Sequence, residues 1–349
     1  MKYIVAFLVL IPITLFLDIT DIGGHSLIFV LSVLSLIPLA ALLGRATEVV
    51  AVFTGPRIGA LLNATLGNAA ELIILIVALR QGLVEVVKAS IAGAIIGNIL
   101  VVLGLSLLVG GLKNGPQFFD SKAAGTNATM MALAVVALVI PAIFALGGEL
   151  RPSDRDIDRL SDGLAIVLVI VYVLYLFFSL RQDGPGAEAH AEEGPPSMKL
   201  PAAIGILVAA TLAIVVMSEV LVGALEPTAE AWGHSELFVG VMLLPVVGNI
   251  AESIVAVQVA HANKMDLSLG IAVGSGLQIA LFVTPILVLV SILFGDQISL
   301  VFNSYELAGL VGAALIAVLI SVDGESNWLE GVELVALYVM LGIAFYFVP

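Results

Sequence analysis

The amino-acid sequence predicts an all-α polytopic membrane protein with eleven transmembrane helices. The chain of 349 residues is 61% hydrophobic and 11% charged, whereas soluble domains average about 45–50% apolar and about 25% charged residues. Its apolar residues form runs of the length that a helix needs to cross a bilayer, about 20 residues. Between these runs lie short stretches rich in Gly, Pro and charged residues, which are typical of turns.

Eleven runs are long and apolar enough to be spans. In order they cover 3–20, 27–53, 58–80, 85–111, 124–147, 160–180, 201–225, 235–261, 267–294, 303–322 and 328–348. The first run lacks the small-x-small cleavage pattern of a secretory signal, so we expect it to be retained as a helix. One long polar stretch, QDGPGAEAHAEEGPPSMK at 182–199, cannot build a core and is predicted to be an acidic linker.

The linker separates two halves that carry matching motifs in the same order. GNAAE at 67–71 corresponds to GNIAE at 248–252, and GAIIGNILV at 93–101 corresponds to GIAVGSGLQ at 270–278. Both members of the second pair contain a GxxxG motif, which indicates a close-packing helix surface. Matches in the same order indicate that the second half is an internal duplication of the first.

A repeat with an odd number of spans returns the chain to the opposite face of the membrane, so its second copy must insert upside down. We therefore predict two inverted five-helix repeats preceded by one extra helix. Secondary transporters share this plan, and their ion site lies near mid-membrane where the repeats meet. The predicted boundaries are an N-terminal extra helix in 1–26, a first repeat in 27–181, an acidic cytoplasmic linker in 182–199 and a second repeat in 200–349.

The charges predict an orientation and exclude one class of partner. With the N-terminus in the cytoplasm, eight of the 13 Lys and Arg residues fall on the cytoplasmic side and five fall outside, as the positive-inside rule favours. We therefore expect a multi-pass protein of the cell membrane with a cytoplasmic N-terminus. The net charge of −14 argues against nucleic-acid binding. The sequence leaves the oligomeric state open, with a homo-oligomer as one alternative.

Two acidic residues interrupt the apolar runs at matching places. An ionised carboxylate at the bilayer centre costs at least ~2.5–3.5 kcal/mol, so Glu71 and Glu252 are expected to face the bundle interior. A structural hydrogen-bonding role is the alternative to a transport role. Asn68 and Glu71 share one helical face, as do Asn249 and Glu252, because each pair is three residues apart. We expect the two faces to meet across the axis that relates the repeats.

The same motifs supply oxygen ligands for a cation. Gly67 and Gly248 have no side chain, so another backbone or an ion can approach closely. Pro245 leaves one carbonyl of its helix without a donor and predicts a kink. Carboxylates, amide oxygens and free carbonyls suit a hard divalent ion, and a flexible site suits Ca²⁺ better than Mg²⁺. The predicted metal ligands are Glu71 and Glu252.

Further polar residues are expected near the site or at its approaches. Asn98, Ser275 and Gln278 lie in the segments with GxxxG motifs, and close packing of those segments brings them toward the core. Glu48 and Glu219 lie nearer the ends of matching spans. They are interpreted either as entrance acids or as ordinary interfacial charges.

The motifs also resemble those of a known family. GNAAEL, and GNIAES followed by NKMDLSLGIAVGSGLQIALFV, resemble the two signature repeats of the calcium/cation antiporter superfamily, specifically its cation/proton exchanger branch. The resemblance covers nearly the whole chain. It implies a secondary active antiporter that exchanges Ca²⁺ for H⁺ by alternating access, with Glu71 and Glu252 binding Ca²⁺ and protons in turn.

The same resemblance implies roles for the other candidates. Ca²⁺ and H⁺ would be transported substrates, and no cofactor is expected. The spans 27–53 and 201–225 would act as gates. Ion contacts would come from Gly67, Asn68, Gly248 and Asn249, with polar support from Asn98, Ser275 and Gln278.

Three other functions are weighed against Ca²⁺/H⁺ exchange. A sodium/calcium exchanger of the same superfamily would resemble a GTSxPE-like pattern, whereas Asn68 and Asn249 here replace the Na⁺-binding hydroxyl. A divalent cation channel needs an open multi-site pore, unlike a carboxylate pair at one depth. An enzyme is not expected, because the sequence has no H-E-x-x-H, G-x-S-x-G or P-loop motif.

Overall fold

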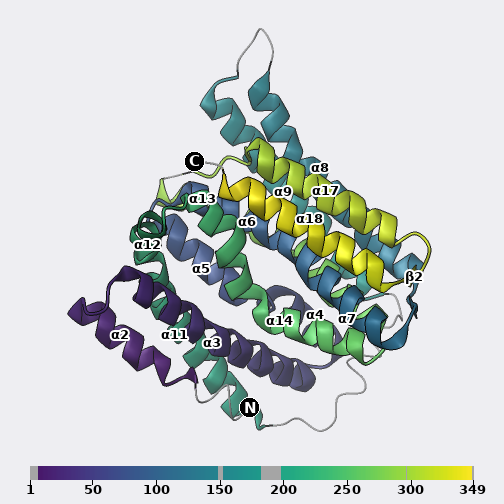
Figure 1. Ribbon diagram of the computed structural model, residues 1–349, viewed down its shortest axis with the longest axis horizontal. Helices are drawn as coiled ribbons and strands as arrows, with labels where there is room; N and C mark the ends of the chain where they lie inside the picture. The colour runs from purple at the N-terminus through teal and green to yellow at the C-terminus, as the bar shows by residue number, and fades with distance from the viewer. Residues whose placement is uncertain (1–6, 148–151, 182–197, 296, 348–349) are drawn as a thin grey trace.

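The computed structural model describes residues 7–147, 152–181, 198–295 and 297–347. The described residues before 182 form eight α-helices and one π-helix, and their path is coloured purple to teal in Figure 1. Their bounds are α2 (Leu10–Thr20), α3 (His25–Thr54), α4 (Pro56–Leu66), α5 (Ala69–Arg80), α6 (Val84–Gly97), the π-helix η1 (Asn98–Leu103), α7 (Gly104–Asn114), α8 (Ser121–Leu146) and α9 (Asp154–Ser179).

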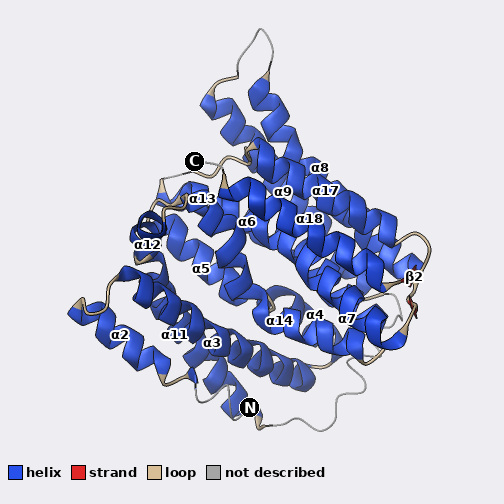
Figure 2. Ribbon diagram, in the orientation of Figure 1, coloured by secondary structure: helices blue, strands red, loops and turns tan. Residues whose placement is uncertain are grey.

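The described residues after 197 continue the helical architecture, and helices dominate the ribbon in Figure 2. Their bounds are α11 (Leu200–Gly223), α12 (Leu225–Trp232), α13 (Glu236–Phe238), the π-helix η2 (Val239–Leu243), α14 (Leu244–His261), α15 (Met265–Gln278), the π-helix η3 (Ile279–Val283), α16 (Thr284–Phe294), α17 (Ser304–Ile320) and α18 (Trp328–Tyr346). Two short strands, β1 (Gln117–Phe118) and β2 (Glu325–Ser326), pair antiparallel and join the loop after α7 to the loop before α18.

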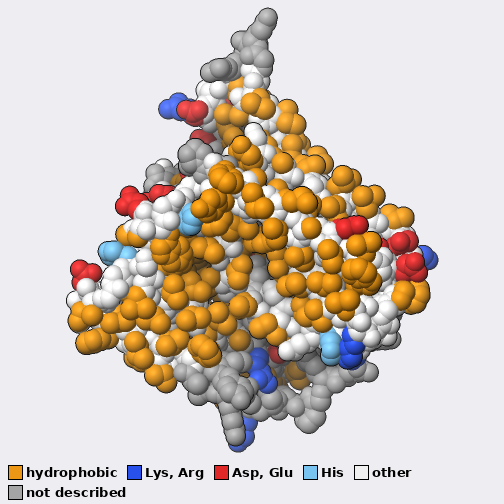
Figure 3. All heavy atoms as spheres, viewed as in Figure 1, with side chains coloured by type: hydrophobic (Ala, Val, Ile, Leu, Met, Phe, Trp, Pro, Cys, Tyr) orange, Lys and Arg blue, Asp and Glu red, His pale blue; other side chains and the backbone are white. Residues whose placement is uncertain are grey.

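The predicted class, an all-α polytopic membrane protein, is confirmed. A helix occupies each of the eleven predicted runs, and apolar side chains cover most of the face shown in Figure 3. The count of eleven spans is not confirmed. Within the described residues, eight helices are long and apolar enough to cross a membrane, or nine if a bent pair forms one span. α2 and α17 have 11 and 17 residues, and a helix of 17 residues is only about 25 Å long.

Two other predictions concern residues that are outside the described part. Most of the predicted linker, residues 182–197, lies outside it, as do the first residues of the run 3–20. The inverted relation of the two halves stays a prediction. The described parts of the halves do share one irregularity, because a π-helix follows the GxxxG motif in each: η1 begins at Asn98, directly after Gly97, and η3 begins at Ile279, five residues after Gly274.

The described helices pack around two large apolar cores and one small one. In Figure 1, α3 and α11 lie side by side, with α2 against α3. These helices share one core with α5 and α12, whereas α8, α9, α15, α16 and α17 pack around a second one. The segment α6–η1–α7 is the most enclosed of the long apolar helices in the described part of the chain. In its most apolar stretch of 18 residues 78% is buried, whereas the corresponding share in α9 is 22%. α3 and α11 therefore form a layer that is distinct from the main bundle.

Helix breaks occur at both copies of the duplicated motif. α4 ends at Leu66 and α5 begins at Ala69, so the first break falls within GNAAE. In the second half, the axes of Glu236–Ile250 and Glu252–His261 differ by 67°. The kink predicted at Pro245 is therefore wrong in position. Pro245 lies in the first turn of α14, directly after η2, where a proline removes no hydrogen bond that the α-helix needs.

The packing of α7 against α18 gives the first testable prediction. A Cβ on Gly331 would lie 2.6 Å from the carbonyl oxygen of Gly104 and closer still to the amide nitrogen of Leu108. We expect Gly331→Ala to destabilise the protein by about 1–3 kcal/mol, because two backbones must separate. The measurement is the thermal unfolding midpoint in detergent.

Gly125→Ala on α8 is the matched control, because a Cβ at Gly125 meets no atom within 4 Å. That variant should be neutral or stabilised by up to about 1 kcal/mol, since Ala is the better helix former. Equal midpoints for the two variants would contradict this account of the α7–α18 contact.

Candidate functional site

The structure brings the two duplicated motifs into direct contact. Glu71 lies in the first turn of α5 and is 4% exposed, and Glu252 lies within α14 and is partly buried. Each glutamate packs against the glycine of the other motif. A Cβ on Gly67 would lie 3.7 Å from Glu252 Oε1, and a Cβ on Gly248 would lie 3.2 Å from the Cβ of Glu71. The glycines therefore leave the space that the opposite carboxylic side chains occupy.

The break between α4 and α5 positions Glu71. Because α5 starts at Ala69, Glu71 lies at a helix N-terminus, whose partial positive charge favours a nearby anion. The break also leaves carbonyl groups of α4 without helical donors. One of them, the carbonyl of Ala64, accepts a hydrogen bond of 2.8 Å from the hydroxyl of Tyr172 on α9. Helix α9 thereby holds the C-terminal end of α4.

A chain of polar side chains joins the two halves beside the carboxylates. Asn98 Nδ2 donates to Ser275 Oγ at 3.3 Å, and Ser275 Oγ donates to Asn68 Oδ1 at 3.3 Å. Asn68 Nδ2 then donates to Gln278 Oε1 at 2.8 Å. Asn68 and Asn98 come from the first half, and Ser275 and Gln278 come from the second. The supporting residues predicted from sequence thus form one connected network.

The Glu71 carboxylate is buried without a hydrogen-bond partner. Among the described residues, neither Oε1 nor Oε2 of Glu71 has one. The Asn249 side chain lies near the Glu71 carboxylate without making a hydrogen bond of good geometry, and the Glu252 carboxylate lies close enough to interact with it electrostatically. An ionised group buried without a partner costs several kcal/mol. Glu71 therefore needs a proton or a cation to neutralise it.

A cavity of about 1000 Å³ leads to this site from one end of the bundle. It is lined by the later part of α3, by α4, by the start of α8, by the end of α9 and by α14 and α15. Glu252 lines the cavity, and Glu71 does not. The two carboxylates therefore differ in access, although they belong to matching motifs.

The sequence-predicted residues fall into three groups in the structure. Some line the cavity, some are buried behind its wall, and one lies at a distance from it. Lining the cavity are Gly67, Gly248, Glu252, Ser275, Gln278 and Glu48. Buried and not among the lining residues are Asn68, Glu71, Asn98 and Asn249. Glu219 on α11 pairs with Arg80 and Gln81 at the end of α5.

One backbone ligand expected from sequence lies elsewhere. Pro245 has no N–H to donate to the carbonyl of Val241. Val241 is not among the residues that line the cavity. It lies against Gly93, where a Cβ would overlap it. The glycine of the first GxxxG motif thus allows α6 to approach η2 closely. No such contact exists at Gly274, which lines the cavity and has open space beside it.

The arrangement suits a hard cation held by oxygen atoms. Within the part of the chain that the structure describes, no group of three or more His, Cys, Asp or Glu side chains could hold a metal ion. A cation here would therefore be held by two carboxylates together with neutral oxygens from amides and backbone. Oxygen ligands of this kind suit Ca²⁺ or Mg²⁺ rather than Zn²⁺ or Cu²⁺.

Reasoning from sequence missed two residues that make contacts between helices near the site, Tyr172 and Arg80. Tyr172 supports the break beside Gly67 and stacks on Phe282, with ring centroids 5.3 Å apart. Its only signal in the sequence is a hydroxyl within an aliphatic span. Arg80 gave no signal, because a basic residue at the end of a span is common at membrane interfaces.

Comparisons with known proteins agree with this architecture. Residues 25–181 and 202–347 match the family model for the sodium/calcium exchanger protein. The chain is 45% identical over 338 residues to a Ca²⁺/H⁺ antiporter of Aphanothece halophytica, covering 92% of this chain and 90% of the relative. It is 43% identical over 328 residues to the Ca²⁺/H⁺ antiporter ChaA of Bacillus subtilis, covering 92% of each. The solved structure of native YfkE matches with a TM-score of 0.85 at 39% identity, covering 98% of this chain and 100% of that one.

The contact between Gly248 and Glu71 gives a second prediction. We expect Gly248→Ala to weaken Ca²⁺ binding by roughly tenfold, because the added methyl group displaces the Glu71 side chain from its place. The measurement is the Ca²⁺-dependent rise in the thermal unfolding midpoint, which reports affinity through linkage. Gly274→Ala is the control, because it lines the same cavity and meets no atom within 4 Å. Equal Ca²⁺ responses in both variants would refute the assignment.

Proposed function

The chain belongs to the sodium/calcium exchanger family, in its Ca²⁺/H⁺ exchanger branch, and we propose that it exchanges Ca²⁺ for H⁺ across the cell membrane by alternating access. One observation carries the proposal. Glu71 and Glu252 come from matching motifs and lie against each other's glycines, with the Glu71 carboxylate buried and unpartnered. Relatives that cover most of the chain are named antiporters, and we propose transport rather than enzymatic catalysis.

The two carboxylates explain how the movements of the ions are coupled. Two negative charges in one dehydrated site repel each other, and a site carrying both cannot cross a low-dielectric barrier cheaply. Ca²⁺ neutralises both charges in one half of the cycle, and protons neutralise them in the other. Ca²⁺ and protons therefore compete for the same oxygens. Exchange follows because neither half of the cycle proceeds with an empty, charged site.

The one-sided cavity supports alternating access. It reaches Glu252 from the end of the bundle where α3 and α9 finish and α8 and α15 begin. With the N-terminus in the cytoplasm, as the distribution of Lys and Arg favours, that end faces the cytoplasm. We propose that this structure is the inward-open state, and that the protein exports Ca²⁺ from the cytoplasm.

The proposed function is tested by ion fluxes in proteoliposomes. An imposed pH gradient should drive uptake of ⁴⁵Ca²⁺, and a proton ionophore should stop it. Uptake that requires a Na⁺ gradient instead would make the protein a sodium/calcium exchanger. Uptake that needs neither gradient would indicate a channel.

Replacing either glutamate with an amide gives the third prediction. Glu71→Gln and Glu252→Gln should each abolish pH-driven Ca²⁺ uptake, because a permanently neutral amide can neither release a proton nor supply the second charge. Glu226→Gln, on the exposed surface of α12, is the matched control and should retain uptake. Substantial pH-driven uptake by either site variant would contradict the shared-site mechanism.

The competition between ions gives a fourth prediction, for pH dependence. Because protons occupy the oxygens that Ca²⁺ needs, the apparent Ca²⁺ affinity should fall as the pH falls. The decrease should approach about tenfold per pH unit for each proton displaced, as linkage requires. Equilibrium ⁴⁵Ca²⁺ binding to the purified protein across pH measures this slope. An affinity that is independent of pH would show that protons bind elsewhere.

A further inference from the structure

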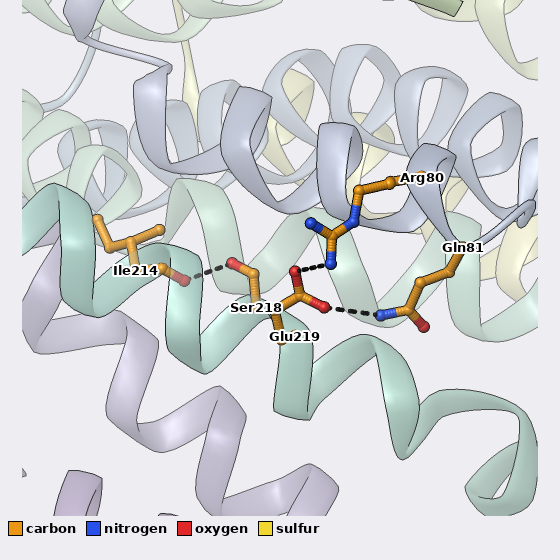
Figure 4. Close-up of polar contacts among 5 residues, drawn as sticks. All are labelled: Arg80, Gln81, Ile214, Ser218 and Glu219. Carbon is orange, nitrogen blue, oxygen red and sulfur yellow. Dashed lines mark hydrogen bonds and ion pairs between the residues drawn. The ribbon is translucent and has the colours of Figure 1, made fainter. Parts of the chain in front are cut away.

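Glu219 takes part in a contact that the proposed ion site does not need. Arg80 Nη2 donates to Glu219 Oε1 at 2.6 Å, and Gln81 Nε2 donates to Glu219 Oε2 at 3.3 Å. Figure 4 shows both donors, at the end of α5, pointing to the one carboxylate on α11. Each oxygen of Glu219 thus has its own donor, so the contact joins the two helices in a defined geometry.

The contact lies on the side of the site that is away from the cavity. Along the α4–α5 segment, the residues that line the cavity end at Ala70. Arg80 is nine residues beyond Glu71, which corresponds to about 14 Å along a helix. The side chain of Arg80 is 59% exposed and that of Glu219 is 33% exposed, so the pair meets solvent at the far end of α5. The site is therefore open at one end and joined by an ion pair at the other.

Matching positions in the two halves have different surroundings. Ser218-Glu219 on α11 corresponds to Thr47-Glu48 on α3. Ser218 Oγ and Thr47 Oγ1 each donate to the carbonyl four residues earlier, at 2.7 and 2.9 Å, and both are buried. Yet Glu48 lines the open cavity, whereas Glu219 is held at the closed end. The glutamate at this helix position therefore lines a cavity at the open end of the site and forms an ion pair at the closed end.

We propose that Arg80 and Gln81 are positioning residues that hold α11 against α5 and keep this end of the ion site closed. The inference rests on the alternating access proposed above. When the site opens to this end, α11 must move away from α5 and the ion pair with Glu219 must break. Because an exposed ion pair contributes modestly, its loss should raise the population of the opened state by about 2- to 5-fold.

A single reporter thiol tests the proposal, because the natural sequence contains no cysteine. Ser218→Cys places the thiol next to Glu219 at a position that is fully buried in this structure. A bulky polar thiol reagent, applied to the full-length protein in detergent, should label it slowly. Adding Arg80→Gln should raise the labelling rate by about 2- to 5-fold. The charge-swapped pair Arg80→Glu with Glu219→Arg should return the rate toward its original value.

Two controls make the outcome decisive. Arg159→Gln removes an exposed arginine elsewhere and should leave the labelling rate unchanged. Val222→Cys, at another buried position of α11, replaces the reporter if Ser218→Cys does not fold, and the same rise is expected there. Equal labelling with and without Arg80→Gln would overturn the proposal. Labelling requires no transport, so the two proposals can fail separately. If Arg80→Gln raises the labelling rate in a protein that does not exchange Ca²⁺ for H⁺, the role of Arg80 in closure stands and the proposed function is rejected.

Discussion

The structure depends on the burial of a carboxylate that has no partner. Glu71 lies at a helix start inside the bundle, and neither of its oxygens accepts a hydrogen bond from the described residues. Protein interiors exclude such groups unless they are compensated, and this compensation must come from a proton or a cation. The break before α5 and the glycine at 248 provide the place that Glu71 occupies, and the amide network of Asn68 and Gln278 joins the two halves beside it.

The surrounding architecture leaves the paired motifs accessible from one end of the bundle, through Glu252. The main bundle holds α6, α7, α15 and α16 in one core, and α3 and α11 lie in a separate layer with α2. Because the core that α3 and α11 share with α5 and α14 is separate from the main one, these two helices can shift without disrupting the packing among α8, α9, α15, α16 and α17. The two ends of the bundle therefore differ: a cavity opens at one end, and the Arg80–Glu219 ion pair joins α5 to α11 at the other.

The sequence predicted the site better than its surroundings. Duplication of the Asn–Glu motif predicted that Glu71 and Glu252 come together, because buried carboxylates are costly unless they have a function. The place of the bend could not be predicted, since Pro245 is accommodated after a π-helix and the axis changes direction within the motif. The contacts of Tyr172 and Arg80 depend on which helices become neighbours, and an apolar pattern carries no such information. The number of spans is likewise unconfirmed, because short helices fall below the length that a bilayer requires.

The central claim is that Ca²⁺ and protons exclude each other from one pair of carboxylates, and proton release on Ca²⁺ binding tests it most directly. Ca²⁺ titrations of the purified protein, followed by calorimetry in two buffers of different ionisation enthalpy, count the protons released per Ca²⁺ bound. The account predicts release of at least one proton at mildly acidic pH, where the empty site is protonated, and none from Glu71→Gln with Glu252→Gln. Ca²⁺ binding with the same heat in both buffers, and hence without proton release, would contradict it.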